Sequence, residues 1–187
     1  KVPIAVFDGE QVGESTAIAR TAIKRVTAGS LAAARRELAV ESHLCSDDAM
    51  KWTEWSDTKF APMVYPNITR SIRECYDTLG YVDQVTEWGF VERQVVRTAG
   101  ALGMGLAHGK IKKKYGIEDE REALLGRVDE WVAEGVAGQP FRGGQAPDLS
   151  DLAVYGAIAA VSGTEAAGEL RQHAGLNDWL RRVEDLL

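Results

Sequence analysis

The segment that most constrains the fold is the beginning of the chain, where a hairpin signal is followed at once by a helix signal. Residues 4–7 are apolar and end at Asp8-Gly9, a dipeptide typical of tight β-hairpin turns. We expect a short return strand around Gln11-Val12, and then a helix that is capped by Glu14 or Ser15. Strand, hairpin and capped helix in this order predict the C-terminal half of a thioredoxin-like domain.

After about residue 30 the apolar residues recur at helical rather than strand spacing. The sequence therefore predicts an α+β protein that is mostly α. We expect residues 1–29 to form the C-terminal half of the thioredoxin-like domain, its first half being absent, and residues 30–187 to form an all-helical domain. The expected helices cover residues 31–42, 47–66, 68–80, 89–113, 119–136, 148–162 and 176–187.

Charge and composition exclude some classes of partner. The chain has 187 residues, 45% of them hydrophobic, and a net charge of −6 with the two signs interspersed, which argues against nucleic acid. The basic run Lys110–Lys114 is followed at once by Glu118–Glu120, so we expect a solvated helix end there. Contact with an anionic membrane or partner is the alternative interpretation of that run.

The cysteines indicate a reducing compartment. Cys45 and Cys75 are isolated and lack Cys-x-x-Cys spacing, so we expect reduced thiols that pack as small core residues. No stretch approaches the roughly 20 apolar residues that a membrane-spanning helix needs. The expected location is intracellular, either mitochondrial or membrane-associated, or else cytoplasmic.

One later segment is a strong folding signal. Gly143-Gly144 and Pro147 predict a tight connection, and Asp148 is placed to cap the next helix. Asp151, three positions later, can accept a hydrogen bond from the backbone of the cap, as in a capping box. The pattern predicts a well-anchored core helix and no catalysis.

The opening also resembles a known ligand site. Val2-Pro3-Ile4, Asp8-Gly9 and Glu14-Ser15-x-Ala17-Ile18 resemble the glutathione-binding half of glutathione transferases. The resemblance implies a cis proline whose neighbouring backbone pairs with the cysteinyl part of glutathione, and an acidic-Ser pair that holds the γ-glutamyl carboxylate and amine. The implied glutathione-binding residues are Val2, Pro3, Glu14 and Ser15. On the residues alone, Ser15 could instead simply cap its own helix, with Glu14 complementing the helix dipole.

Further motifs narrow the resemblance to the type-2 membrane-associated prostaglandin E synthase branch of that superfamily, whose fold ends in an all-helical glutathione-transferase-type domain. That branch is associated with glutathione, haem and the isomerisation of prostaglandin H. Its thiol motif lies in the first strand–helix unit of the thioredoxin-like domain, so we expect no catalytic residue in this chain. The motifs are Lys51-Trp52-x-x-Trp55-x-Asp57, Tyr65-Pro66-Asn67-Ile68-x-Arg70, Gly100-Ala101-x-x-Met104 and Trp179-x-x-x-Val183-Glu184.

Haem would need an axial ligand, and the chain offers only three histidines: His43, His108 and His173. None of them stands in a ligand motif. We therefore expect no metal site and no haem from this chain alone, with glutathione as the one expected cofactor.

The helical region also offers weak candidates for a substrate pocket between the two domains, namely Trp52, Tyr65 and Asn67. Trp52 and Trp55 share a helix face, which is equally typical of core packing. Pro66 should interrupt the helix that carries Tyr65. In the family a related break lies near the interdomain cleft.

Two functions are consistent with the sequence. The first is a glutathione-binding protein of the prostaglandin E synthase type 2-like family, a thiol-dependent isomerase or transferase if residues before Lys1 carry the nucleophile. The second is a non-catalytic accessory subunit of a larger assembly, such as a mitochondrial membrane complex. Glutathione, a second copy of the chain, a larger protein assembly and a peripheral membrane contact are the expected partners.

Overall fold

The chain begins with a β-hairpin packed beside one helix. A computed structural model describes residues 3–27 and 39–186. Strands β1 (Ile4–Phe7) and β2 (Glu10–Gly13) pair antiparallel, with Ile4 opposite Gly13. Asp8 and Gly9 both have positive φ, of 49° and 87°, as a type I′ turn requires, so the predicted hairpin is confirmed. Helix α1 (Ser15–Thr27) follows directly.

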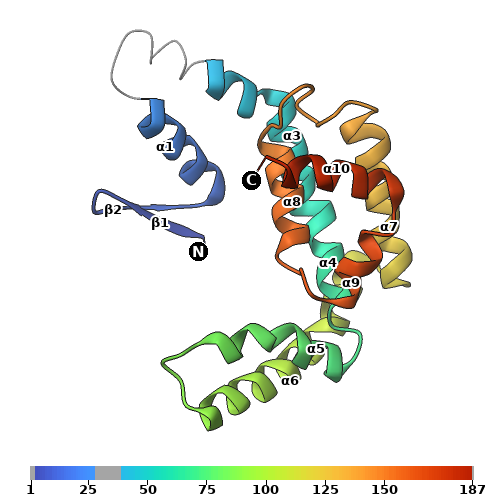
Figure 1. The fold of residues 1–187 in the computed structure, drawn as a ribbon. Coiled ribbons are helices and arrows are strands. Elements are labelled where there is room, and N and C mark those ends of the chain that lie inside the picture. Colours follow the sequence, from blue (N-terminus) through green and yellow to red (C-terminus); the bar gives the residue numbers. More distant parts are fainter. Residues whose placement is uncertain (1–2, 28–38, 187) are drawn as a thin grey trace.

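Helices make up most of the remaining described chain, and Figure 1 shows them gathered on one side of the hairpin and α1. A short helical turn over residues 39–44 leads into this bundle. The predicted boundary near residue 30, and most of the expected helix 31–42, lie outside the described residues. The later elements are α3 (Asp47–Trp55), η1 (Ser56–Phe60), α4 (Ala61–Asn67), α5 (Ile72–Thr78), η2 (Leu79–Gln84), α6 (Phe90–Tyr115), α7 (Glu120–Glu130), η3 (Trp131–Val136), α8 (Leu149–Ala159), α9 (Glu165–Leu170) and α10 (Ala174–Glu184).

Stacked aromatic rings form the centre of the bundle. Trp131 lies 5.9 Å from Trp55 and 5.3 Å from Trp179, measured between ring centroids, and Trp52 lies 5.7 Å from Trp131. Phe60 stacks on Trp55 at 5.9 Å. These rings come from α3, η1, η3 and α10, so the core joins segments that are far apart in sequence. Burial of such large rings is the main contribution that apolar side chains make to stability here.

The predicted capping box at the start of α8 is confirmed. The Asp148 carboxylate accepts hydrogen bonds from the backbone N–H of Ser150 (2.8 Å) and of Asp151 (3.3 Å), and Asp151 accepts one from the N–H of Asp148 (2.9 Å). Asp151, which is completely buried, also accepts hydrogen bonds from the backbone of Arg142 and Gly143 and from the Trp179 indole. One carboxylate thus connects the 141–147 loop, α8 and α10.

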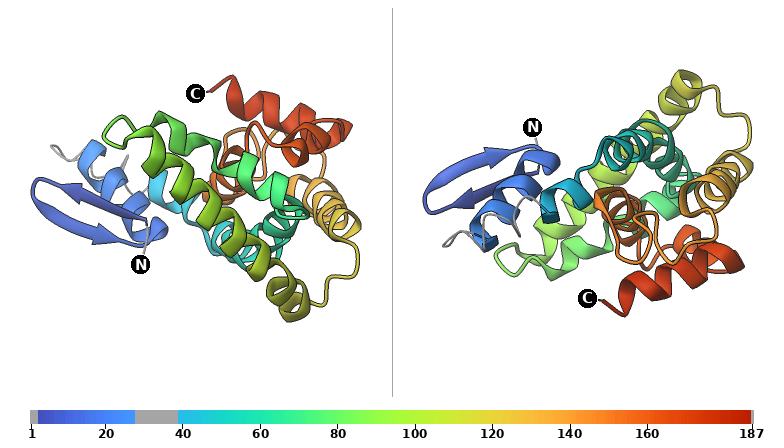
Figure 2. Two further views of the ribbon diagram at one scale, coloured as in Figure 1. Left: turned by 90° about the horizontal axis from the view of Figure 1, so that it is seen from below. Right: turned by 90° about the horizontal axis from the view of Figure 1, so that it is seen from above.

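Helices α5 and α6 form an arm that projects from the bundle, drawn in green at the bottom of Figure 1 and seen from two other sides in Figure 2. Glycines allow the two helices to approach closely: a Cβ at Gly100 would lie 2.7 Å from Leu79, and one at Gly105 would lie 2.8 Å from Ile72. Two glycines of α6 thus permit its close contact with η2 and α5. Lys110–Lys114 lie at the end of α6, as predicted.

The structure differs from the sequence-based expectation in the regularity of the helices. The expected helix 47–66 is interrupted by a π-helical turn, η1, where the Ala61 N–H bonds to the Ser56 carbonyl, and it ends at Asn67, directly after Pro66. A second π-helical turn, η3, follows α7, and α9 was not expected at all. In the described ranges, 3–27 and 39–186, no helix has the combination of length and hydropathy needed to cross a membrane.

Candidate functional site

The hairpin brings together two of the residues assigned to a glutathione site. The Glu14 N–H donates to the Pro3 carbonyl at 3.2 Å, which places Pro3 directly beside the start of α1. Glu14 has φ +76°, a left-handed conformation that costs a residue with a side chain about 1–3 kcal/mol. Strain of this kind is common at ligand sites. Val2 lies outside the described residues.

The start of α1 is electrostatically suited to an anion. The first hydrogen bond of the helix runs from the Ile18 N–H to the Glu14 carbonyl at 2.9 Å. The N–H groups of residues 15–17 precede that bond and therefore have no acceptor within the helix. Together with the helix dipole, they give this end a partial positive charge that favours a carboxylate. Ser15 is the first residue of α1 and is exposed, so its hydroxyl can take part in the same contact.

A cavity lies between the N-terminus of α1 and the helical bundle. It has a volume of about 280 Å³, and Ser15 and Thr16 form the α1 wall. Its opposite wall combines polar and apolar side chains from α3, η1 and α8: Thr53, Asp57, Leu149, Leu152, Ala153 and Gly156. An adjoining depression of about 540 Å³ shares Thr16, Thr53 and Asp57 with it. The two segments that the sequence assigns to different domains thus border one cleft.

Asp57 is the acidic side chain that lines the 280 Å³ cavity, while the adjoining depression is also lined by Asp47, Glu54 and Lys51. It lies in the π-helical turn η1 and lines both hollows. Burial raises the pKa of the Asp57 carboxyl above its ordinary value, although part of the side chain remains exposed. An ammonium group placed beside it would relieve that cost by opposite charge. The cleft therefore offers an anion site on α1 and a cation site on η1.

Asp57 is part of one of the family motifs in the sequence, but the sequence alone indicated no role for it. The signal that could have found it is its position after Trp55 in a helical segment already linked to the cleft. Its orientation depends on the π-helical turn, and π-helical turns are frequent at functional sites. No periodicity in the sequence predicts such a turn.

The weak pocket candidates, Trp52 on α3 and Tyr65 and Asn67 on α4, lie deeper in the bundle. Trp52 is half-buried and packs 5.0 Å from Trp55 within the aromatic core. The Tyr65 hydroxyl donates to the Met104 carbonyl at 3.1 Å, which ties α4 to α6. Burial, and to a smaller degree the neighbouring Cys75, raises the pKa of Tyr65.

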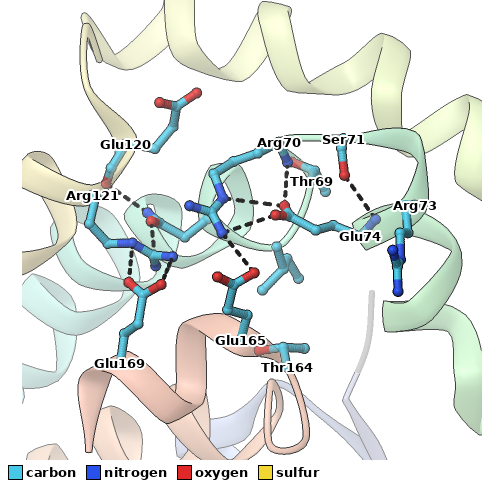
Figure 3. Close-up of polar contacts among 12 residues, drawn as sticks. Thr69, Arg70, Ser71, Arg73, Glu74, Glu120, Arg121, Thr164, Glu165 and Glu169 are labelled. Carbon is cyan, nitrogen blue, oxygen red and sulfur yellow. Dashed lines mark hydrogen bonds and ion pairs between the residues drawn. The ribbon is translucent and has the colours of Figure 1, made fainter. Parts of the chain in front are cut away.

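Asn67 is fully buried and joins the end of α4 to the start of α7. Its side-chain amide donates to the carbonyls of Met63 (2.8 Å) and Glu120 (2.7 Å), and its oxygen accepts from Arg121 at 3.0 Å. Arg121 also donates to Glu169 on α9 at 2.6 Å, as Figure 3 shows. Asn67 in addition borders a separate hollow of about 340 Å³ near α5 and α9, away from Ser15 and Asp57.

Beside Asn67, a second ion-pair group joins the same helices. Arg70 pairs with Glu74 at 2.9 Å and with Glu165 at 3.3 Å, so that it bridges the start of α5 to α9. Figure 3 shows the Arg70 and Arg121 guanidinium groups side by side, each facing a carboxylate of α9. The two arginines and the carboxylates of Glu74, Glu165 and Glu169 thus pair with one another, which is typical of a structural joint.

The histidines are occupied by contacts within the protein. His108 contacts the Thr69 hydroxyl (2.9 Å) and Glu120 (3.1 Å), and His173 caps α10 and contacts Asp129 at 3.0 Å. His43 contacts the Pro147 carbonyl at 3.2 Å. Among the described residues no group of three or more His, Cys, Asp or Glu side chains is placed to hold a metal ion. Cys75 is buried and Cys45 half-buried, and both are free thiols.

The fold and the cleft together define a mostly helical protein with a hairpin–helix unit beside a bundle and a polar cleft between the two. The sequence is homologous to prostaglandin E synthase 2: it is 32% identical over 138 residues to the Mus musculus protein, covering 73% of this chain and 36% of that one. The prostaglandin E synthase 2 of Danio rerio is 27% identical over 138 residues, or 73% of this chain and 37% of that protein. The match takes in little more than a third of the length of these curated relatives. No family model matches the chain.

Proposed function

We propose that the chain binds glutathione in the cleft between α1 and the bundle. The observation that carries this proposal is that Ser15, at the free N-terminus of α1, and Asp57, on η1, line one cavity. The γ-glutamyl end of glutathione carries a carboxylate and an ammonium on the same carbon. The helix N-terminus suits the first and Asp57 suits the second.

The contacts proposed for the rest of glutathione follow from the residues around Ser15 and Asp57. The backbone beside Pro3 is held at the start of α1 by the hydrogen bond from Glu14, so the peptide part of the ligand would extend toward β1. Leu152 on α8 is 43% exposed and gives the cleft an apolar wall. We also propose that the hairpin and α1 are the second half of a thioredoxin-like domain, followed by a glutathione-transferase-type helical domain.

Catalysis would depend on residues outside this chain. Ser15 and Asp57 can hold and orient a thiol ligand, while neither cysteine lines the cavity: Cys45 lies just after the helical turn 39–44 and Cys75 lies on α5. We propose a thiol-dependent isomerase or transferase of the prostaglandin E synthase type 2-like family if a preceding segment brings a reactive cysteine to the cleft. The homology to prostaglandin E synthase 2 over 138 residues supports this proposal.

Isothermal titration calorimetry with the full chain tests the binding. We expect Ser15→Ala to weaken glutathione binding by about 1–2 kcal/mol, the scale of a hydrogen bond to a charged group. Ser42→Ala is the matched control, since Ser42 is an exposed serine whose hydroxyl bonds to the Ala39 carbonyl. Equal affinity of the two variants, or no binding by the unmodified chain, would contradict the proposal.

A modified ligand distinguishes the contribution of Asp57 to binding from that of the α1 N-terminus. Glutathione lacking the γ-glutamyl amino group should bind the unmodified chain more weakly. It should bind Asp57→Asn with no further loss, because the group that Asp57 contacts is already gone. Additive losses would remove Asp57 from the site and leave the α1 contact standing.

The alternative function, a non-catalytic accessory subunit, is favoured by a separate observation. Helix α6 exposes several large apolar side chains: Val91, Val95, Leu102 and Leu106 are 71%, 61%, 53% and 78% exposed. Apolar patches of this kind usually mark an interaction surface. Glutathione binding and such a surface are compatible, so the calorimetry decides whether the accessory role stands alone.

A further inference from the structure

Another hollow lies against a different face of α8 from the one that borders the cleft at α1. It has a volume of about 390 Å³ and is bordered by α8, the loop that follows it, α9 and α10. Its lining includes three buried apolar side chains, Ile158, Ala167 and Leu180, which are 4%, 7% and 0% exposed. Among the described residues, none lines both this hollow and the cleft of Ser15 and Asp57. We call it the α9 hollow.

Small residues leave room for a ligand in the α9 hollow. Its lining includes Ala159, Gly163, Ala167 and Gly168. A Cβ atom at Gly168 would meet no heavy atom of a neighbouring segment within 4 Å. Glycine lowers the stability of a helix, because it gives the unfolded chain more backbone freedom, and α9 has only 6 residues. Gly168 therefore leaves space beside the hollow at a cost in helix stability.

Two opposite charges also line the α9 hollow. Arg171 follows α9 and Glu184 ends α10, and the Arg171 guanidinium donates to both oxygens of the Glu184 carboxylate. This hydrogen bonding lowers the pKa of Glu184 and raises the pKa of Arg171, so both groups are charged at neutral pH. The two side chains are 46% and 34% exposed. Because solvent reaches both of them, the pair can open at small cost.

The hydroxyl of Tyr155 lies close to this ion pair. Tyr155, on α8, lines the same hollow and is near enough to Arg171 for the two groups to interact electrostatically. Within residues 3–27 and 39–186, its hydroxyl has no hydrogen-bond partner. The α9 hollow thus combines a cation, an anion and an uncommitted hydroxyl with buried apolar side chains. An apolar pocket with a few convergent polar groups is the usual form of a small-molecule site.

The balance of charge defines the class of ligand. A molecule with a single charge would be attracted by one member of the Arg171–Glu184 pair and repelled by the other. A zwitterion can pair with both members. Its carboxylate would accept hydrogen bonds from Arg171 and Tyr155, and its ammonium would donate to Glu184. An α-amino acid carries these two groups on one carbon, so its side chain would extend over Ile158 and Leu180.

We propose that the α9 hollow binds a free α-amino acid with a large apolar side chain. Its volume of about 390 Å³ is near the lower end of the roughly 300–1,000 Å³ that is typical of small-molecule sites, which suits a ligand of this size. The buried lining favours an apolar side chain, because a polar one would lose its hydrogen bonds to water there. The site is separate from the proposed glutathione cleft and does not depend on it.

A chemical-shift titration of the full chain with three probes of similar size tests the charge requirement. L-Phenylalanine carries both charges, 3-phenylpropanoate lacks the ammonium and phenethylamine lacks the carboxylate. We expect L-phenylalanine to bind at least about tenfold more tightly than either analogue, since each analogue loses a charge-assisted hydrogen bond. The amide signals of Gly163 and Gly168 should shift. Equal affinities for the three probes, or no binding of L-phenylalanine, overturn the proposal.

A glycine substitution tests the location of the site. Gly168→Leu should fill the α9 hollow and abolish the binding of L-phenylalanine, with an unchanged circular dichroism spectrum because the new side chain enters open space. Gly103→Leu is the matched control, since Gly103 also lies within a helix and a Cβ there would meet no neighbouring atom within 4 Å. It should leave binding intact. Binding that survives Gly168→Leu shows that the ligand lies elsewhere and overturns the proposal.

Two further variants test the assigned contacts. Glu184→Gln should remove the preference for L-phenylalanine over 3-phenylpropanoate and keep the preference over phenethylamine, because only the contact with the ammonium is lost. Ser15→Ala should not affect the binding of L-phenylalanine, whatever it does to glutathione. If Ser15→Ala abolishes L-phenylalanine binding, the amino acid occupies the cleft at α1 and the proposal is wrong.

Discussion

At the scale of single residues, the buried carboxylate of Asp151 holds several segments of the described fold together. Four donors, from Arg142, Gly143, Asp148 and Trp179, reach it at 2.9–3.1 Å. Each of these N–H groups would lose its partner if the carboxylate were removed, and a buried unpaired donor costs about 1–3 kcal/mol. Asp151 therefore stabilises the fold by far more than an ordinary helix cap.

We predict that Asp151→Ala lowers the free energy of unfolding by roughly 3 kcal/mol or more. Asp151→Asn should cost less, since one oxygen remains to accept hydrogen bonds. Urea denaturation provides the measurement. Asp178→Asn, at an exposed position on α10, is the control and should leave the midpoint unchanged. A loss below 1 kcal/mol in Asp151→Ala would mean that water replaces the carboxylate.

Glu14 should show a conflict between stability and ligand binding. Its φ of +76° favours glycine, so we predict that Glu14→Gly leaves the free energy of unfolding equal or raises it by up to about 1 kcal/mol. The same change should weaken glutathione binding, because the acidic side chain of the proposed Glu14-Ser15 pair is lost. Thermal denaturation and calorimetry on one preparation measure both effects. Destabilisation together with unchanged affinity would contradict this account.

Asp57, like Glu14, is predicted to lower the stability of the fold, but for an electrostatic reason. Because burial raises the pKa of its carboxyl, ionisation of Asp57 opposes folding above the ordinary carboxyl pKa. Asp57→Asn should therefore increase stability at neutral pH, by no more than about 0.5 kcal/mol because solvent screens a partly exposed group. The gain should vanish at pH 3, where the carboxyl is protonated in both states. A denaturation series at the two pH values checks the sign.

At the scale of elements, the junction of α6 and α7 depends on one carboxylate. Glu120 accepts hydrogen bonds from Lys112 at 2.7 Å and from the His108 ring at 3.1 Å. Burial acts to raise the pKa of Glu120, but the Lys112 hydrogen bond, the local backbone and the charges of Lys112 and His108 outweigh it and hold this pKa below its ordinary value. The ionised form is therefore the one that stabilises the junction.

It follows that this stabilisation is complete above the unfolded-state pKa of Glu120, near 4.5, and is lost as the pH falls through the lower folded-state pKa. We predict that Glu120→Gln removes on the order of 1.5 kcal/mol at pH 7 and little at pH 2.5. Glu184→Gln is the comparison, since the hydrogen bond from Arg171 likewise lowers the pKa of Glu184 at a more exposed position. Its loss should be smaller. A pH-independent effect of Glu120→Gln would exclude titration as the cause.

The elements also show how far sequence reasoning reaches. Local chemistry predicted the hairpin turn at Asp8-Gly9 and the capping box at Asp148, because each is specified by residues within a few positions of each other. The π-helical turn at Ser56–Phe60 was not predictable in this way. The π-helical turn depends on how Trp55 and Phe60 pack against aromatic rings from distant parts of the chain. One extra residue in a helix changes the spacing of apolar residues too little to be recognised in the sequence.

The residues of the candidate site likewise divide into those that the local sequence predicts and those that depend on tertiary packing. Pro3, Glu14 and Ser15 were predicted from one short motif, and the hairpin indeed places Pro3 against Glu14. Asp57 was missed as a site residue because it lines the same cavity as Ser15 only through tertiary packing, although the two residues are far apart in sequence. Asn67 was proposed for a pocket on the strength of a helix break, and the structure shows its amide bonded to α4 and α7. Only tertiary packing distinguishes these cases.

At the scale of the whole molecule, the arm and the bundle should respond differently to protein concentration. If the exposed apolar side chains of α6 bind a second copy of the chain, which is one of the expected partners, amide hydrogen exchange in α6 should slow as the protein concentration is raised. Exchange in α8 and α10 should not change, since these helices belong to the bundle core. Mass spectrometry of peptic peptides gives the measurement. Leu102→Glu should abolish the concentration dependence without altering the bundle peptides.

The crowding of tryptophans in the bundle has an optical consequence. Four of the five tryptophans, Trp52, Trp55, Trp131 and Trp179, lie within about 6 Å of at least one other ring of the group, whereas Trp88 lies on the arm and is 39% exposed. Rings this close exchange excitation energy, so the bundle should emit as one coupled, blue-shifted source and Trp88 as a separate red-shifted one. The intrinsic fluorescence of the unlabelled protein can thus follow the bundle and the arm independently in a single spectrum.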